Sequence, residues 1–273
     1  MTEEKINPTI VTEEAKKTLA SSIKDPMTYE PGMDQLPSTM LEDVERLMKE
    51  FEEQTYSTSD VKAALRKDVL SPHDFGALLS PAARPYLEAM AQKAKAVRDR
   101  YFGNSVALFT PLYLANYCEN YCIYCGFNCH NKIHRARLDL AQMEEEMKAI
   151  AATGLEEILM LTGESSHMSP VSYIGEACKM ARRYFRVVGL EIYPVNQKDY
   201  EYLHQCGCDF VTVFQETYDH DLYGKLHLAG NKRVFPYRFY TQERALLGGM
   251  RGVGLGALLG LSLIHISEPT RRS

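Results

Sequence analysis

Three cysteines stand close together near the middle of the chain, in the pattern Cys118-x3-Cys122-x2-Cys125. Short spacings of this kind let one loop bring several thiolates to a single iron-sulfur cluster. A cube of four irons held by three cysteines keeps one iron without a protein ligand, and an open position of this type distinguishes catalytic from structural metal sites. We therefore expect a catalytic 4Fe-4S cluster on Cys118, Cys122 and Cys125.

The open iron suits a ligand that chelates through an amine and a carboxylate, as the methionyl group of S-adenosylmethionine (SAM) does. Transfer of one electron from the reduced cluster to the bound sulfonium would break its bond to carbon and release a 5'-deoxyadenosyl radical, chemistry that side chains alone do not supply. The expected cofactors are therefore a 4Fe-4S cluster and SAM.

A fourth thiol, Cys129, follows the triplet closely. The alternative is therefore a closed site of four thiolates that holds structural zinc or an electron-transfer cluster in a protein that is no enzyme. We expect Cys129 not to be a ligand. The remaining cysteines fall on a predicted helix or at a helix end, where a free cysteine usually acts as a small buried hydrophobe: Cys178, Cys206 and Cys208.

Composition narrows the class of protein. The chain has 273 residues, of which 45% are hydrophobic and 25% charged, as in soluble globular domains. Its seven cysteines are clustered and odd in number, a poor pattern for a disulfide framework. A net charge of -5 argues against nucleic acid as a partner. The polar first residues and the absence of a run of about 18 apolar residues argue against a signal peptide or a membrane span, so we expect a cytoplasmic protein.

The first hundred residues predict short amphipathic helices, which we group as an N-terminal helical extension over 1–103. Ser71 and Pro72 are typical of a helix start, and a longer helix is expected from about 81 to 101, ended by Gly103. An apolar stripe predicts an earlier helix that contains Leu41, Val44, Leu47, Met48 and Phe51.

From residue 104 onward, predicted strands and helices alternate. Asp139 and Gln142 form the pattern of a capping box at the start of one helix. Five strand-helix steps indicate an α/β fold with a parallel sheet, a partial (β/α) TIM-like barrel over 104–261. Such barrels keep their chemistry at the carboxyl ends of the strands, and the cysteine triplet follows the first predicted strand. The strands are expected at 106–109, 157–161, 188–193, 210–214 and 252–259.

The last residues do not continue the barrel. Residues 262–273, which begin Ser-Leu-Ile-His-Ile-Ser-Glu-Pro-Thr-Arg, resemble the translation of a sequencing-library adapter. We interpret them as a non-native tail joined to a barrel that is truncated after its fifth strand.

Four motifs in this order resemble the radical SAM tyrosine lyases: Cys118-Glu-Asn-Tyr-Cys-Ile-Tyr-Cys-Gly-Phe127, Thr162-Gly-Glu164, Gln215-Glu-Thr-Tyr218 and Gly254-Leu-Gly-Ala-Leu-Leu-Gly260. The resemblance runs from about residue 68 to 261. It implies a radical SAM-type barrel and cleavage of the Cα–Cβ bond of L-tyrosine to p-cresol and 2-iminoacetate (dehydroglycine), which thiazole synthase uses for the thiazole moiety of thiamine. A low-potential electron donor is the other implied partner.

A sister lyase of hydrogenase cofactor maturation is the alternative inside this family. It also splits tyrosine, but its product leads to cyanide and carbon monoxide. The stretches Gly189-Leu-Glu-Ile-Tyr-Pro194 and Gly254 to Gly260 resemble the thiamine enzyme more closely, so we favour that role.

The resemblance also implies cofactor contacts. Tyr124 would lie near the adenine of SAM, and Thr162, Gly163 and Glu164 would bind the methionyl amine, for which a carboxylate is suited. Further cofactor contacts are implied for Glu191 and for two glycines that would let the backbone approach the nucleoside, Gly254 and Gly256.

Candidate catalytic residues follow the fourth predicted strand. Glu216 and Tyr218 stand at its carboxyl end, and Arg238 is suited to bind a carboxylate, either that of SAM or that of tyrosine. The alternative is an ion pair between Glu216 and Arg238 that supports a loop, beside a packed Tyr218. His220 and His227 are the histidines nearest this motif.

Overall fold

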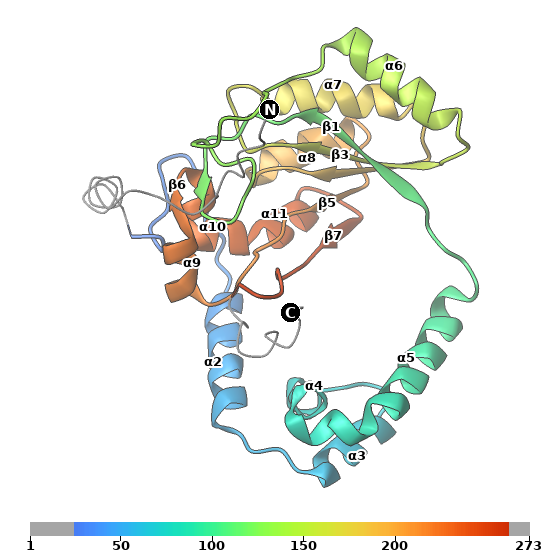
Figure 1. Cartoon of the computed structure of the whole chain (residues 1–273), viewed down its shortest axis with the longest axis vertical. Helices are drawn as coiled ribbons and strands as arrows, with labels where there is room; N and C mark the ends of the chain where they lie inside the picture. Colours follow the sequence, from blue (N-terminus) through green and yellow to red (C-terminus); the bar gives the residue numbers. More distant parts are fainter. Residues whose placement is uncertain (1–24, 262–273) are drawn as a thin grey trace, which may run out of the picture. The chain divides into compact units, whose positions relative to one another are not determined.

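The computed structural model describes residues 25–261 and divides into two compact units (Figure 1). One unit contains residues 25–36 together with 108–261, and the other contains residues 37–107. The tail that we predict to be non-native, residues 262–273, lies outside the described residues.

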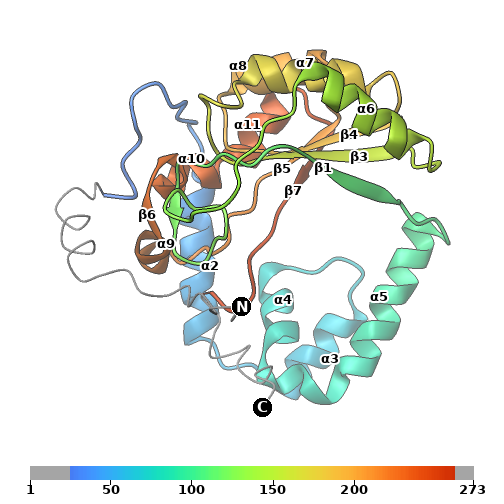
Figure 2. The same cartoon turned by 45° about the horizontal axis from the view of Figure 1, so that its top comes forward.

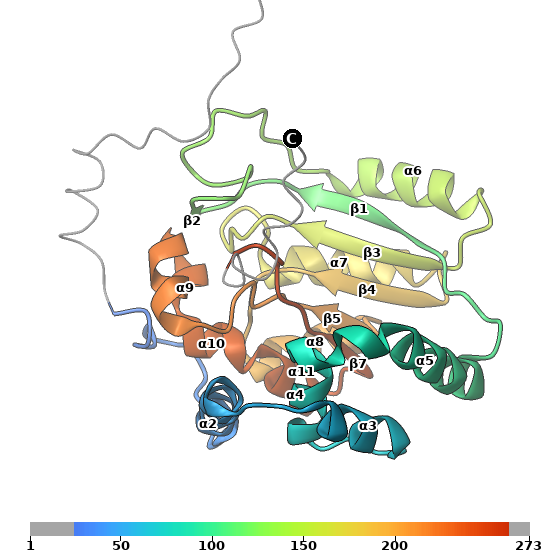
Figure 3. The same cartoon turned by 60° about the horizontal axis from the view of Figure 1, so that its bottom comes forward.

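A five-stranded parallel sheet forms the centre of the first unit. Its strands are arranged in the order β1 (Phe109–Ala115), β3 (Glu157–Thr162), β4 (Val187–Glu191), β5 (Phe210–Thr212) and β7 (Gly252–Gly254). Every neighbouring pair is parallel, so all carboxyl ends meet at one edge (Figure 3). The predicted parallel sheet of a partial α/β barrel is confirmed.

Helices cover one face of this sheet (Figure 2). They are α6 (Leu140–Ala151), α7 (Val171–Ala181), α8 (Gln197–Gln205) and, packed beside α8, α11 (Thr241–Leu247). The core lies between the two layers, where Met143 and Met147 of α6 and Ile174 of α7 are fully buried with apolar strand residues. The capping box of Asp139 and Gln142 is present, which confirms that prediction.

The sheet differs from the sequence prediction at its ends. The first strand begins at Phe109, and the predicted strand residues Val106 and Leu108 are 72% and 65% exposed. The last strand, predicted over 252–259, pairs only at 252–254. Apolar side chains had marked these residues as strand, but in a parallel sheet the extent of a strand is set by the length of its neighbours.

Short elements that the sequence did not predict lie at the carboxyl edge of the sheet. A two-residue strand, β2 (Tyr121–Cys122), pairs antiparallel with β6 (His227–Ala229). Segments this short show no hydrophobic periodicity. Next to β6 in the chain are α9 (His220–Leu226), η2 (Asn231–Arg233) and α10 (Phe235–Phe239).

The second unit is helical, with α2 (Met40–Glu53), α3 (Thr58–Arg66), α4 (Pro72–Leu79), η1 (Pro81–Tyr86) and α5 (Leu87–Phe102). Ser71 caps α4 as predicted. The single helix expected from about 81 to 101 is instead a 3-10 turn followed by α5, because Pro85 has no amide hydrogen for an α-helical bond. Of the predicted apolar stripe on α2, only Leu41 is buried.

The unit boundary differs from the helical extension that we expected over 1–103. Residues 25–36 belong to the sheet unit. Phe235 N donates to Pro26 O at 2.9 Å, and Gln197 N donates to Asp34 Oδ2 at 2.9 Å, so this segment is bonded to α10 and α8. In the described part of the chain, no helix is long and apolar enough to cross a membrane.

Candidate cluster and cofactor site

A cavity of about 180 Å³ lies at the carboxyl ends of the parallel strands. Both Glu191 at the end of β4 and Thr212 at the end of β5 face it. The fold therefore gathers residues that are far apart in the sequence. Most of the predicted site residues line the cavity: Cys118, Cys122, Cys125, Thr162, Gly163, Glu164, Glu191, Glu216 and Arg238.

The three predicted cluster ligands come from one loop that leaves β1. Cys122 is buried in β2, while Cys118 and Cys125 are partly exposed. Cys125 N donates to Cys122 O at 3.1 Å, a turn that holds these two residues together. Burial raises the pKa of the Cys122 thiol to about 12 and also raises that of Cys118. Such thiols ionise when a metal replaces the proton.

The donor set fits a 4Fe-4S cluster. Three thiols face one cavity that also holds room and polar groups for a second ligand. Among residues 25–261, no group of three or more His, Cys, Asp and Glu side chains is arranged to hold a single metal ion. Cys129 is exposed, and it is not among the described residues that line the cavity.

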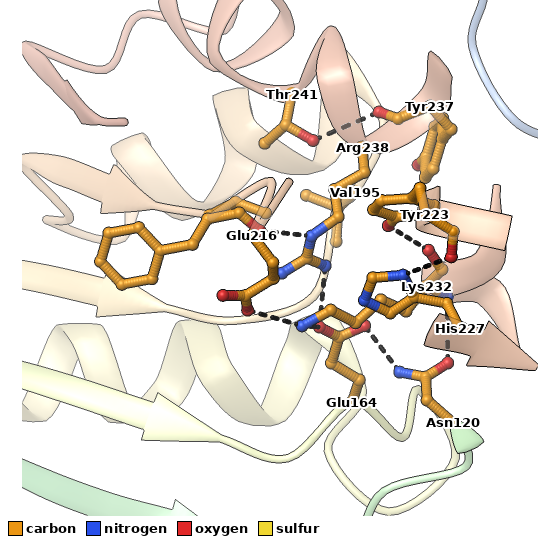
Figure 4. A network of polar contacts seen from close by, with 12 residues as sticks. Asn120, Glu164, Val195, Glu216, Tyr223, His227, Lys232, Tyr237, Arg238 and Thr241 are labelled. Atoms are coloured by element: carbon orange, nitrogen blue, oxygen red, sulfur yellow. Dashed lines mark hydrogen bonds and ion pairs between the residues drawn. The ribbon is translucent and has the colours of Figure 1, made fainter. Parts of the chain in front are cut away.

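Glu164 is the most tightly held acid in the cavity (Figure 4). Its Oε1 accepts from Arg238 Nη1 at 2.8 Å, and its Oε2 accepts from Asn120 Nδ2 at 2.8 Å. Burial by itself raises the pKa of Glu164, but the positive charges of Arg238 and Lys232 outweigh it and hold the pKa below its usual value. The residue is therefore a carboxylate, suited to a cationic amine.

A second ion pair lies beside the first. Lys232 Nζ donates to Glu216 Oε1 at 2.9 Å and lies 4.0 Å from Glu164 Oε1. The sequence analysis gave an ion pair between Glu216 and Arg238 as the alternative. The structure instead pairs Glu164 with Arg238 and Glu216 with Lys232. Burial and the charge of Glu216 raise the pKa of the neighbouring Glu191.

Lys232 and Asn120 are cavity residues that the sequence analysis missed. Lys232 sits in the short 3-10 turn η2. No local pattern in Gly-Asn-Lys-Arg distinguishes it from a solvated lysine. Asn120 appeared only as part of the motif from Cys118 to Phe127, although an asparagine with both donor and acceptor atoms is suited to joining two segments.

The other predicted residues are not among the described residues that line the cavity. Tyr124 forms a 2.6 Å hydrogen bond between its hydroxyl and Nε2 of His227, and Tyr218 packs edge-on against Phe239. Gly254 lies against Thr212 at the end of β5, and Gly256 lies against Phe214 just beyond that strand, because an added Cβ would stand 2.4 Å from Thr212 Oγ1 and 2.5 Å from Phe214 Cδ1, respectively. Their roles toward a cofactor stay predictions.

Gly163 sets the distance between β3 and the cysteine loop. An added Cβ would stand 2.2 Å from the carbonyl oxygen of Tyr117, a backbone atom that precedes Cys118 directly. We expect Gly163→Ala to displace the loop, to lower stability by about 1–3 kcal/mol and to reduce bound iron per chain. Thermal unfolding and iron analysis would measure both. Gly126→Ala is the matched control, since no atom lies within 4 Å of its added Cβ; equal iron loss in both variants would contradict the explanation.

Comparison with known proteins identifies similar chains. A family model of the radical SAM superfamily matches residues 112–244. The 2-iminoacetate synthase of Salmonella typhimurium is 41% identical over 206 residues, which are 76% of this chain and 55% of that protein. The 3-methylornithine synthase of Methanosarcina acetivorans is 32% identical over 195 residues, which are 68% of this chain and 55% of that protein.

A solved structure is also similar. The crystal structure of HydG, a maturase of the FeFe-hydrogenase, matches with a TM-score of 0.74 at 26% identity, covering 82% of this chain and 52% of that chain. The present chain thus spans about half the length of the relatives it matches. The segment that the family model matches contains the cysteine triplet, Glu164, Glu216 and Arg238.

Proposed function

Since the chain belongs to the radical SAM superfamily, we propose that it cleaves the Cα–Cβ bond of L-tyrosine to p-cresol and 2-iminoacetate. One observation carries the proposal. A single cavity presents three cysteines together with two largely buried ion pairs, the groups needed for a cluster and for ligands that carry amines and carboxylates. The identity of 41% to a 2-iminoacetate synthase supports tyrosine as the substrate.

The positions of the residues support the following roles. Cys118, Cys122 and Cys125 would hold the 4Fe-4S cluster, which together with SAM supplies a 5'-deoxyadenosyl radical. Glu164 would bind the methionyl amine of SAM, and Arg238 keeps that carboxylate ionised and fixed at 2.8 Å.

The proposal extends to partners. The product 2-iminoacetate would pass to a thiazole synthase for the thiazole moiety of thiamine, and a low-potential electron donor would reduce the cluster. We place this reaction in the cytoplasm. The relatives named 2-iminoacetate synthase support this role.

The test is anaerobic reconstitution with iron and sulfide, followed by incubation with SAM, dithionite and L-tyrosine. We expect p-cresol and 5'-deoxyadenosine to form together, and neither to form without SAM. Formation of 5'-deoxyadenosine without p-cresol would show that tyrosine is not the substrate.

The structural similarity to HydG keeps the sister lyase as a second candidate. Both candidates predict p-cresol from tyrosine, so this product does not separate them. Cyanide in the same reaction mixture would favour the maturation role, while glyoxylate from hydrolysis of 2-iminoacetate, without cyanide, would favour the thiamine role.

A further inference from the structure

Glu216 and Lys232 both line the cavity, and their charged groups form an ion pair. Lys232 is 9% exposed as a residue, and its ammonium donates to Glu216 at 2.9 Å. Removing two charges from water costs free energy, and their mutual attraction often does no more than offset that cost. An ion pair of this kind is therefore weak evidence for stability. Stability alone therefore does not account for the pair.

The backbone of Lys232 is fixed without help from its side chain. Its amide donates to Asn120 Oδ1 at 3.0 Å, and its carbonyl accepts from the Tyr223 hydroxyl. The ammonium is thus free to exchange partners while the main chain stays in place. Figure 4 shows the side chain reaching toward Glu216 and Glu164.

Glu216 is held in an unusual backbone conformation. It is the one non-glycine residue with positive φ, at 69°, among the described residues. Thr217 N donates to Gln215 O at 2.9 Å around it, which makes a strained γ-turn, and Leu258 N donates to its carbonyl at 2.8 Å. Strain of this kind persists where surrounding structure enforces it and clusters at ligand sites. Here the turn places a carboxylate at the cavity.

We propose that the Glu216–Lys232 pair receives the α-amino acid head group of the substrate, with Lys232 binding its carboxylate and Glu216 its ammonium. This inference rests on the proposed function. An amino acid carries both charges on neighbouring atoms, so it can replace each partner of the ion pair by its own group of the same sign. Every buried charge then keeps an opposite charge before and after binding, which avoids an unpaired buried ion.

The methionyl group of SAM also carries an ammonium and a carboxylate on one carbon. The cavity contains two ion pairs, one for each of two such ligands. Glu164 is bonded directly to the cysteine loop, because Asn120 Nδ2 donates to its Oε2 at 2.8 Å and Glu119 N to its main-chain oxygen at 3.0 Å. We therefore assign the Glu164–Arg238 pair to SAM at the cluster and the Glu216–Lys232 pair to the substrate.

The test is anaerobic titration calorimetry of the reconstituted chain. The ligands are L-tyrosine, tyramine, which lacks the carboxylate, 3-(4-hydroxyphenyl)propionate, which lacks the amine, and, in a separate arm, SAM. We expect Lys232→Met to weaken tyrosine binding by about 10- to 100-fold, the value of one charge-assisted hydrogen bond. Tyramine binding should not weaken, because its ammonium no longer has to displace a lysine from Glu216. Glu216→Gln should show the reverse selectivity. Lys225→Met, at an exposed lysine of α9, should leave every affinity unchanged.

A charge-swapped variant, Glu216→Lys with Lys232→Glu, separates binding from support of the fold. It keeps an internal ion pair, so a purely structural pair predicts restored tyrosine binding, and that result would overturn the proposal. We expect instead a folded protein, judged by its thermal unfolding, that still binds tyrosine weakly. A loss of SAM affinity in this variant, with tyrosine affinity intact, would also overturn the proposal, since the pair would then bind the methionyl group of SAM.

The same measurements distinguish failure of the proposed function from failure of the inference about the ion pair. If the wild-type chain binds and cleaves another amino acid but not tyrosine, tyrosine is not the substrate. The Lys232→Met and Glu216→Gln variants would then be tested with that amino acid and with its analogues that lack the carboxylate or the amine, and the same selectivity would support the role of the ion pair. If the wild-type chain binds no amino acid, both inferences fall. If tyrosine is cleaved and bound, but Lys232→Met weakens tyrosine and tyramine equally, only the inference about the pair falls.

Discussion

Replacement of Cys122 by alanine is expected to remove the 4Fe-4S cluster and to lower turnover by more than about 1,000-fold, because ligand, cluster and radical chemistry act as one unit. Cys122 is buried in β2 and lines the cavity. Its loss leaves two thiols, too few to hold the cube. Electron paramagnetic resonance of the reduced, reconstituted protein, with and without SAM, would measure the change.

Cys129→Ala is the matched control in the same loop. Its thiol is exposed and is not among the described residues that line the cavity, so we expect the resonance signal and its response to SAM to be retained. This pair of variants separates the open cluster from a closed site of four thiolates. Loss of bound metal in both variants, with a signal that does not respond to SAM in the wild type, would support the closed site and contradict the enzyme proposal.

The parts of the fold that were predictable from sequence have local causes. The helix start at Ser71 and the capping box of Asp139 and Gln142 are each defined by residues within four positions of one another, and both are present. Alternating strands and helices predict a parallel sheet because a crossover connection is the way to join parallel strands. The three buried cysteines outside the loop were also predicted correctly: Cys178, Cys206 and Cys208.

The charged network of the cavity was not predictable in the same way. Which acid pairs with Arg238 depends on where α10 lies relative to β3, and that position is set by long-range contacts. The same holds for Lys232, whose neighbour Glu216 is 16 residues away in the chain. Sequence reasoning placed the acids at the strand ends correctly, but it paired Arg238 with Glu216 as its alternative, where the structure pairs it with Glu164.

Sequence patterns also missed how the cysteine loop is fastened. The antiparallel pairing of β2 with β6 joins Cys122 to His227, and Tyr124 bonds to the same histidine. The sequence analysis noted His227 only as one of the histidines nearest the Gln215 motif. Burial, with the charge of Lys232, lowers the pKa of this histidine to about 3. A neutral imidazole that bonds on both sides is a supporting group.

Arg238→Met is expected to be the most destabilising change at the site, by about 3–5 kcal/mol, because it leaves a buried carboxylate without its partner. Arg238 is 4% exposed and also donates through Nε to Phe214 O at 2.6 Å, so a buried carbonyl loses its donor as well. Urea unfolding at neutral pH, with the m-value checked for constancy, measures the loss of free energy. Arg186→Met is the control, since its ion pair is 81% and 65% exposed and should contribute less than about 1 kcal/mol.

The pH dependence of the stability of Arg238→Met shows whether Arg238 stabilises the charged form of Glu164. In the wild type, Arg238 and Lys232 outweigh burial and lower the pKa of Glu164, so the stability from its charged form is present above the unfolded pKa and is lost as pH falls through the folded pKa. Without Arg238, burial dominates and favours the protonated form of Glu164. Acidification should therefore narrow the difference in free energy of unfolding between the variant and the wild type. Arg238→Met combined with Glu164→Gln should recover part of the lost stability and show no such narrowing. If the double variant were as unstable as the sum of both single variants, the two side chains would not be coupled, and the role of Arg238 in holding Glu164 would have to be abandoned.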